Sequence, residues 1–220
     1  MFMIIVGAGT IGACLIDIAV REKNSVVVVE SDSERATEIS REFDVTVLDA
    51  DATVVETLRE AGAEKADALV ATTSDDAVNL MVVTIAAELG IPSIVSVVNE
   101  RSHSGFFRRL GAIVMENPEE VVAAHLYNTV KRPRLQDYVA LPDGAQVFRL
   151  ELRSKSPLVG RTVQEVVEEQ KVPSTLRILA IMRDGRTEIA RGDAVLRQGD
   201  LVTFYSLDRV ANGWVEKLIG

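Results

Sequence analysis

Three glycines and one acid near the N-terminus have the spacing of a phosphate-binding site. Gly7, Gly9 and Gly12 directly follow a short apolar run, and Glu30 stands 18 positions after the last of them (30 − 12). Glycines in this pattern allow a tight turn, let a pyrophosphate approach the backbone and let a helix pack closely on a sheet. An acid at this distance accepts hydrogen bonds from ribose hydroxyls. The pattern predicts a dinucleotide site, and the carboxylate disfavours the additional phosphate of NADP.

The segments around these residues have the patterns of a strand, a helix and a second strand. Phe2–Val6 and Val26–Val29 are apolar runs rich in β-formers, and Ile11, Leu15 and Ile18 recur between them at helical spacing. We expect this helix to press the apolar stripe onto a sheet and to point its unpaired N-terminal N–H groups at the phosphates. The glycines alone would also fit a turn in an α/β fold that binds no nucleotide. The strands, the helix and the acid together favour the binding site.

Strands and helices continue to alternate, which is typical of a Rossmann-type, doubly wound parallel sheet. The further expected strands are Val45–Leu48, Ala68–Ala71, Ile94–Val98 and Ala112–Val114. A helix from about Ser33 to Glu42 would face inward with Ala36 and Ile39, and Thr53 would open the next helix with a capping box. The other expected helices cover about Ala77–Leu89 and Gly105–Leu110.

Ligands of such sheets bind beyond the carboxyl ends of the strands. We therefore expect Asp51 and the turn Thr72–Ser74 to join the glycine loop at one edge of the sheet. Helix capping is the alternative role for Asp51 and Thr73, and it is compatible with ligand contact.

The second half of the chain predicts a helix, a linker and a small α+β domain. Asn117 and Pro118 are a strong helix start, and the helix would run to about Lys131. Its apolar residues are Val121, Val122, Leu126 and Val130, and we expect them to pack on a partner subunit. The predicted domains are residues 1–133 and 146–220, joined by a linker at 134–145. Strands are expected at Val147–Leu152, Leu176–Arg183, Thr187–Ala190 and Leu201–Tyr205, and a last helix at Val210–Ile219.

Composition excludes several classes of protein. The formal net charge is −9, which disfavours nucleic-acid binding through a basic face. The single cysteine, Cys14, excludes a disulfide framework, and we expect its thiol to be buried in the first helix. No apolar run reaches the roughly 20 residues of a membrane span. The chain starts directly with a strand, so we expect no signal peptide and a cytoplasmic location.

Groups for catalysis are not apparent in the sequence. His103 and His125 lack a matching carboxylate motif, and neither a Tyr-x-x-x-Lys spacing, a zinc cluster nor a P-loop is present. We therefore expect the nucleotide to be sensed rather than consumed, and the protein not to be an enzyme. An NAD-dependent oxidoreductase is the alternative.

Several motifs together resemble one family. They are Ile4–Gly12, Asp51–Thr53, Leu58–Ala63, Ala66–Asp67, Thr73–Asp76 with Asn79, Ala112–Pro118, Ser156–Arg161 and Leu196–Asp200. This combination resembles the TrkA family of potassium-uptake regulators, which are built from an RCK (or KTN) domain and a TrkA-C domain. The resemblance covers nearly the whole chain and places the helix from Pro118, the crossover helix, in the first domain.

The resemblance implies NAD(H), or ATP or ADP, as the ligand and assigns the residues of the site. The implied site residues are Gly7, Ala8, Gly9, Thr10 and Ile11 for the phosphates, Glu30 for the ribose, Asp51 and Ala52 for the adenine, and Thr73 and Ser74 for the remaining edge. Many relatives carry arginine where this chain has Thr10 and Ser96. The loss of positive charge favours a dinucleotide over a triphosphate.

The resemblance also implies the partners. It predicts a cytosolic subunit that gates a membrane potassium transporter of the Trk or Ktr type without entering the membrane itself. The crossover helix would join two chains in a homodimer, and dimers would assemble into a ring. A stand-alone redox sensor and a regulator of another cation transporter are the alternatives, which differ only in the partner.

Overall fold

The computed structural model describes residues 1–131, 135–141, 144–169 and 171–208, together with residues 215 and 218. The chain divides into two compact units, Met1–Val121 and Val122–Gly220. The domain bounds expected from the sequence, at residues 133 and 146, stay predictions. No helix among the described residues is long and apolar enough to cross a membrane.

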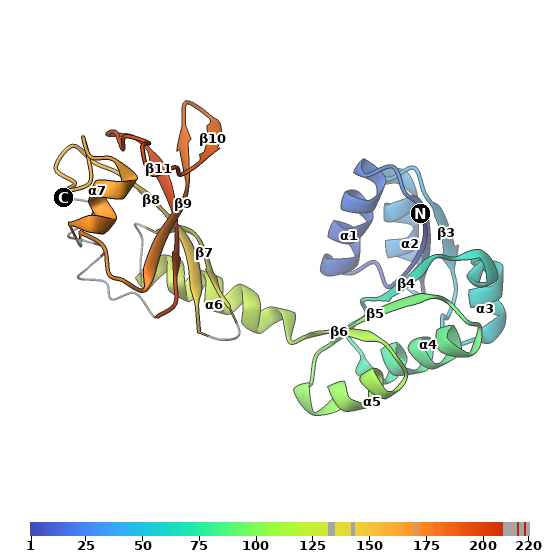
Figure 1. Cartoon of the computed structure of the whole chain (residues 1–220). Coiled ribbons are helices and arrows are strands. Elements are labelled where there is room, and N and C mark those ends of the chain that lie inside the picture. The colour runs from blue at the N-terminus through green and yellow to red at the C-terminus, as the bar shows by residue number, and fades with distance from the viewer. Residues whose placement is uncertain (132–134, 142–143, 170, 209–214, 216–217, 219–220) are drawn as a thin grey trace. The chain divides into compact units, whose positions relative to one another are not determined.

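The first unit contains a six-stranded parallel sheet with the strand order β3-β2-β1-β4-β5-β6 (Figure 1). Its strands are β1 (Phe2–Val6), β2 (Ser25–Glu30), β3 (Thr46–Asp49), β4 (Ala68–Ala71), β5 (Ser93–Val98) and β6 (Ile113–Glu116). The strand order reverses at β1, between β2 and β4. Such a switch point is where ligands of doubly wound sheets bind. The Rossmann-type fold predicted from the sequence is confirmed.

Helices cover both faces of this sheet. They are α1 (Thr10–Arg21), α2 (Ser33–Glu42), α3 (Val55–Glu60), α4 (Asp76–Glu88) and α5 (Ser104–Arg109), with short 3₁₀ helices at Ala63–Lys65 and Arg101–His103. Successive side chains of a strand point to opposite faces, so Ile4 joins one core and Ile5 the other. Helices α1 and α2 cover the face of Ile5, whereas α3, α4 and α5 cover the face of Ile4.

Helix α1 lies on the sheet with a different stripe from the one expected. Ile11 and Ile18 are 41% and 57% exposed, and Leu15 is only partly buried. The buried residues of α1 are Gly12, Ile16 and Ala19. Both stripes have helical spacing, but the close approach of Gly12 to the turn at Gly7 rotates the buried face of the helix by one position. Cys14, expected to be buried, is exposed for the same reason.

The second unit contains a five-stranded antiparallel sheet with the order β10-β9-β11-β8-β7 (Figure 1). Its strands are β7 (Leu135–Ala140), β8 (Gln146–Glu151), β9 (Leu176–Arg183), β10 (Arg186–Ile189) and β11 (Leu201–Ser206). Phe148 and Phe204 stack at 5.4 Å between ring centroids in its core. Asp184 and Gly185, both at positive φ, form the predicted two-residue hairpin turn between β9 and β10.

Helices α6 and α7 lie in the described part of this half of the chain. Helix α7 (Val163–Glu168) begins with a capping box in which Thr162 and Glu165 each accept a hydrogen bond from the other's backbone N–H. Helix α6 (Pro118–Lys131) contains the boundary between the two units, and it buries none of its residues. The expected last helix, Val210–Ile219, lies outside the described residues except for Val215 and Leu218, which are buried.

The segment expected to be an irregular linker contains strand β7, so this expectation is wrong for residues 135–140. β7 pairs antiparallel with β8, but its register shifts between Gln136 and Val139, and Asp137 has a positive φ of 49°. The bulge removes the strict alternation of apolar and polar residues by which a strand is recognised in a sequence. Pro133 and Pro142, which favoured a linker, lie outside the described residues.

Candidate functional site

Two of the three glycines in the loop after β1 are required by the fold itself. Gly7 has a φ of +87°, and a Cβ there would lie 2.9 Å from the Thr73 side chain. A Cβ on Gly12 would lie only 2.0 Å from the carbonyl oxygen of Gly7. The chain therefore turns sharply off β1, and α1 packs against the turn, as the sequence predicts.

Gly9 differs, because it faces open space. A Cβ on Gly9 would meet no atom within 4 Å, and its φ of −62° is one that any residue adopts. Gly9 is also the N-cap of α1, and no side chain caps the helix there. The N–H groups of the first turn, at Thr10 and Ile11, are therefore not covered by a capping side chain. An open backbone corner at an uncapped helix N-terminus suits a diphosphate.

Glu30 ends β2 beside this loop. Its Oε2 accepts a hydrogen bond from the N–H of Ala8 at 2.6 Å, and its Oε1 accepts one from the N–H of Asp32 at 3.0 Å. Each carboxylate oxygen has a second lone pair, so the group still has acceptor capacity for ribose hydroxyls. The carboxylate is therefore held in place before any ligand arrives.

Arg35 is a residue of this site that the sequence reasoning missed. It lies in the first turn of α2, and its Nε donates to the carbonyl oxygen of Ala8 at 2.7 Å. Its Nη1 forms an ion pair with Glu38 at 2.8 Å. An arginine on a helix has no spacing signal that points to a loop 27 positions earlier, so only the tertiary structure places it here.

The turn after β4 is fixed to the same loop. Thr72 donates from its hydroxyl to the Gly7 carbonyl at 2.8 Å, and Thr73 donates to Asn79 Oδ1 at 2.7 Å. The fully buried Asn79 in turn donates to the carbonyl of Thr73 at 3.0 Å and to that of Val97 at 3.2 Å. Ser74 is exposed at the tip of the turn. Asn79, which the sequence indicates only as part of a family motif, holds this turn in shape.

Asp51 and Thr73 do not cap helices in this structure, so the alternative role considered for them is wrong. Asp51 Oδ1 accepts hydrogen bonds from the backbone N–H and the hydroxyl of Thr53, at 2.8 and 2.7 Å, which lowers the pKa of the Asp51 carboxyl. Because the Thr53 hydroxyl is used in this way, the expected capping box does not form, and α3 begins without a side-chain cap after Val54. Asp75 caps α4 instead.

Asp76 organises the neighbouring loop after β5. Its Oδ1 accepts from the N–H of Asn99 at 2.8 Å, and its Oδ2 accepts from the N–H of Glu100 at 3.0 Å and lies 2.8 Å from His103 Nδ1. Burial raises the pKa of Asp76, but these hydrogen bonds outweigh it, so the pKa is lowered. His103, in the segment after β5, thus makes a structural contact to the start of α4.

The strand register brings the segments that carry the predicted site residues to one edge of the sheet. Val6 is level with Val29 and with Ala71, and Glu30 is level with Asp49. The segments that follow these parallel strands therefore leave the sheet side by side. They carry Gly7, Ala8, Gly9, Thr10 and Ile11 after β1, Glu30 at the end of β2, Asp51 and the buried Ala52 after β3, and Thr73 and Ser74 after β4.

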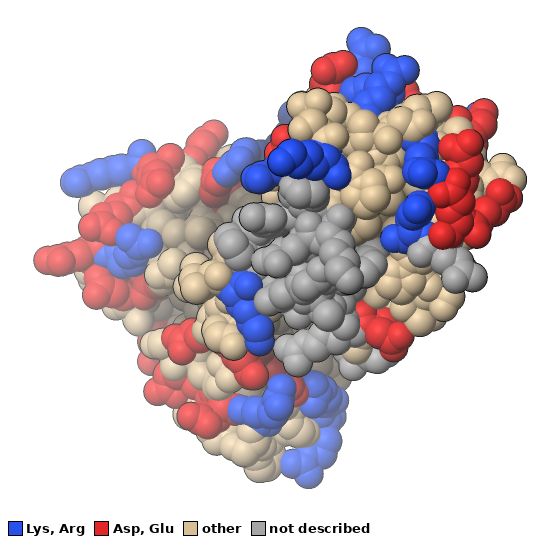
Figure 2. All heavy atoms as spheres, turned by 90° about the vertical axis from the view of Figure 1, so that its left-hand side faces the viewer, with Lys and Arg blue, Asp and Glu red and all other residues tan. Residues whose placement is uncertain are grey.

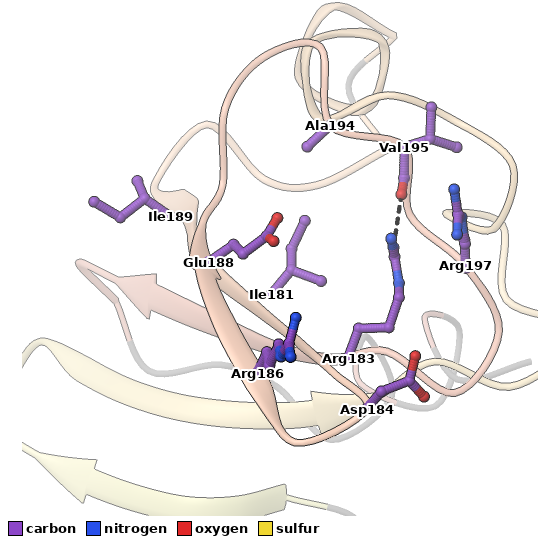
Figure 3. Close-up of a pocket in the computed structure, with 9 residues that line it drawn as sticks. All are labelled: Ile181, Arg183, Asp184, Arg186, Glu188, Ile189, Ala194, Val195 and Arg197. Carbon is purple, nitrogen blue, oxygen red and sulfur yellow. Dashed lines mark hydrogen bonds between the residues drawn. The ribbon is translucent and has the colours of Figure 1, made fainter.

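A cavity of about 540 Å³ lies in the second unit, between the β9–β10 hairpin and the segment around Val195 (Figure 3). Its wall contains three arginines and two acids: Arg183, Arg186, Arg197, Asp184 and Glu188. Arg183 already forms two hydrogen bonds of 2.7 Å with the buried Asp200, and it also donates to the Val195 carbonyl. These partners use the charge of Arg183 within the fold.

The surface charge is mixed on the face shown in Figure 2, where basic and acidic side chains are interspersed. Lys and Arg together number 24 and Asp and Glu 33 in the whole chain. Nucleic acid is bound through a basic field. That the chain binds none stays a prediction.

Each half of the chain matches the model of a known domain family. Residues 3–118 match the model of the TrkA-N domain. Residues 147–210 match the model of the TrkA-C domain. Together the two matches include the glycine loop, the parallel sheet except Phe2, and the strands β8 to β11 except Gln146.

Two curated relatives carry related names. The chain is 30% identical over 204 residues to the "Trk system potassium uptake protein TrkA homolog" of Methanothermobacter thermautotrophicus, with 92% of each chain covered. It is 33% identical over 210 residues to the "Trk system potassium uptake protein TrkA" of Azorhizobium caulinodans, with 93% of this chain and 45% of that protein covered. The chain thus spans nearly all of the first relative and about half of the second.

Solved structures of GsuK are similar in fold. The GsuK channel matches with a TM-score of 0.67 at 20% identity, covering 100% of this chain and 39% of that chain. A GsuK channel bound to NAD matches with a TM-score of 0.62 at 20% identity and the same coverage. GsuK bound to ADP matches with a TM-score of 0.52 at 27% identity, covering 60% of this chain and 34% of that chain.

Proposed function

The chain belongs to the TrkA family, and from this premise we propose that it is a regulatory subunit of a potassium uptake system that binds NAD(H) or an adenine nucleotide. The observation that carries this proposal is the open backbone corner at Gly9, next to the uncapped N-terminus of α1 and the fixed carboxylate of Glu30. The GsuK structures with NAD and ADP support a nucleotide as the ligand.

In this proposal each segment of the sheet edge has a role. The loop Gly7–Ile11 holds the phosphates through the N–H groups of Gly9, Thr10 and Ile11, and Glu30 holds the ribose. The N–H groups of Gly7 and Ala8 donate to Val29 and Glu30 and fix the shape of the loop. Asp51 and Ala52 border the adenine, and Thr73 and Ser74 form the opposite border. The dinucleotide fits this edge best, because the loop itself carries no positive charge for a third phosphate.

Control of transport follows from linkage. A nucleotide shifts the shape of an assembly only if it binds one conformation better than another. A difference of roughly a hundredfold in affinity is enough to reverse a nearly balanced equilibrium. The protein needs no catalytic group for this role, and we propose that it senses the nucleotide without consuming it. The described residues contain no cluster of His, Cys, Asp and Glu that could hold a metal ion.

The proposed partners are a membrane potassium transporter of the Trk or Ktr type and further copies of this chain. The subunit would act on the cytoplasmic side of the membrane and reach it only through its transporter. Helix α6 is the proposed contact between two copies, because Val122, Leu126 and Val130 are 59%, 61% and 82% exposed.

Titration calorimetry of the full chain with NADH, NAD⁺, ADP and ATP tests the proposal. We expect saturable binding of at least one of them, with the dinucleotide bound more tightly than ATP. A parallel screen for hydride transfer from NADH should show no turnover. Absence of binding at millimolar nucleotide, or turnover of a substrate, would refute the proposed function.

A further inference from the structure

The backbone of Ala8 is held from both sides by charged side chains. Its N–H donates to Glu30 Oε2 at 2.6 Å, and its carbonyl oxygen accepts from Arg35 Nε at 2.7 Å. Glu30 comes from the end of β2 and Arg35 from the first turn of α2. Two successive peptide units of the glycine loop are therefore fixed by side chains from elsewhere in the fold.

The peptide unit between Ala8 and Gly9 sets the direction of an N–H group at the open corner of the loop. The Ala8 carbonyl and the Gly9 N–H belong to the same planar peptide unit, in which they point in opposite directions. Arg35, by binding the carbonyl, therefore fixes the direction of the Gly9 N–H as well. Glycine adopts more backbone conformations than any other residue, so this peptide unit would otherwise turn easily.

Arg35 is itself held in place. Its backbone N–H donates to the capping carboxylate of Asp32 at 2.9 Å, and its Nη1 pairs with Glu38 at 2.8 Å. Immobilising a long arginine side chain costs rotamer entropy, and these contacts offset that cost. The guanidinium is thus ready to hold the loop before a ligand binds.

We propose that Arg35 is a positioning residue of the nucleotide site, which orients the N–H groups of the loop toward the phosphates by holding the Ala8 carbonyl. This inference rests on the proposed function. A preorganised loop binds phosphate without reordering, which improves affinity without a direct contact to the ligand.

The test compares Arg35→Ala, Arg35→Lys and the control Arg41→Ala in the full chain. Arg41 lies in the last turn of the same helix and is exposed. Hydrogen–deuterium exchange of residues 7–13 without ligand measures the order of the loop, and calorimetry measures ADP affinity. For Arg35→Ala we expect faster exchange in the loop and roughly tenfold weaker ADP binding, the size of one charge-assisted hydrogen bond. Lysine keeps a charged donor and should restore much of both, whereas Arg41→Ala should change neither.

The outcomes separate this inference from the proposed function. Unchanged exchange and unchanged ADP affinity in Arg35→Ala would overturn the role of Arg35. If Arg41→Ala changed loop exchange and ADP affinity as much as Arg35→Ala, the role of Arg35 would also be overturned, because the cause would then be a general destabilisation of α2. If the unaltered protein binds neither ADP nor NADH, the proposed function fails. The exchange comparison then still decides whether Arg35 orders the loop.

Discussion

At the scale of single residues, the site depends on backbone groups whose directions are set by a few side chains. Gly7 and Gly12 are glycines because neighbouring atoms leave no room for a Cβ, whereas Gly9 leaves a space that the protein does not fill. Each carboxylate oxygen of Glu30 accepts one hydrogen bond from a backbone N–H group. We therefore propose that the candidate site recognises its ligand through fixed hydrogen-bond donors and acceptors.

Replacing Glu30 should weaken NADH binding. Glu30→Ala removes the ribose acceptor together with the anchor of the Ala8 N–H, and hydrogen bonds to a charged group contribute about 1.5–3 kcal/mol, or roughly tenfold to a hundredfold in affinity. Glu30→Gln keeps one acceptor oxygen, so its affinity for NADH should lie between those of the wild type and of Glu30→Ala. Calorimetry with NADH measures both, and Glu42→Ala, an exposed acid at the end of α2, is the control. If Glu30→Ala bound NADH with wild-type affinity, Glu30 would not be the ribose acceptor.

Two glycine substitutions should have opposite effects. Gly9→Val places a side chain in the open corner, so it should leave the melting temperature nearly unchanged and reduce nucleotide affinity at least tenfold, about 1.4 kcal/mol. Gly12→Ala places a Cβ against the Gly7 carbonyl and should lower the melting temperature even without ligand. Thermal melts and calorimetry on the same samples distinguish them. A Gly9→Val protein that still binds nucleotide would mean that the loop is only structural.

At the scale of elements, helix packing decides which side chains reach the site. Helix α1 buries Gly12 and Ile16 because the glycine permits close contact with the turn below, and this leaves Ile11 and Ile18 at the surface. Helix α4 begins with Asp75 and Asp76, of which the first caps the helix and the second holds the loop after β5. The start of α4 is thus connected by hydrogen bonds to the segment after β5.

The Asp76 contacts should make stability depend on pH. The pKa of Asp76 in the folded protein is lower than the ordinary value of 3.8, so its contribution is fully present above that pH and is lost as the pH falls through the lowered value. Asp76→Asn should therefore destabilise the protein at neutral pH, by about 1–3 kcal/mol. The difference from wild type should narrow below pH 3.8. Urea unfolding at several pH values measures this.

An exposed acid gives the matched control for that experiment. Asp44→Asn removes the same charge at an exposed position between α2 and β3. It should leave the stability unchanged across the same range. A constant difference between wild type and Asp76→Asn at all pH values would show that the charge of Asp76 does not matter.

At the scale of the whole molecule, the chain is two units with a helix at their boundary. Helix α6 buries none of its residues, although it carries a broad apolar face. Contiguous apolar surface of this kind marks interaction sites in proteins. We propose that this face is covered by a second copy of the chain.

Charged residues on this face should therefore separate the copies. The double variant Leu126→Glu and Val130→Glu should halve the mass measured by light scattering, if α6 joins two chains. Ala124→Glu is the control, because residue 124 is exposed and lies about 160° around the helix from Leu126. An unchanged mass in the double variant would exclude α6 from the assembly.

The sequence by itself determined the strands other than β7, most of the helices and the sheet edge at which the candidate site lies. Apolar runs and glycine spacing are local patterns, and the parallel order of the strands then brings their ends together. The features that only the tertiary structure decided depend on distant partners. The face of α1 is set by the contact of Gly12 with Gly7, strand β7 is hidden by its bulge, and Asp51 binds Thr53 in place of a helix cap. Arg35 reaches Ala8 from another helix. In each case the local sequence is compatible with more than one conformation or hydrogen-bond partner, and tertiary packing determines which one forms.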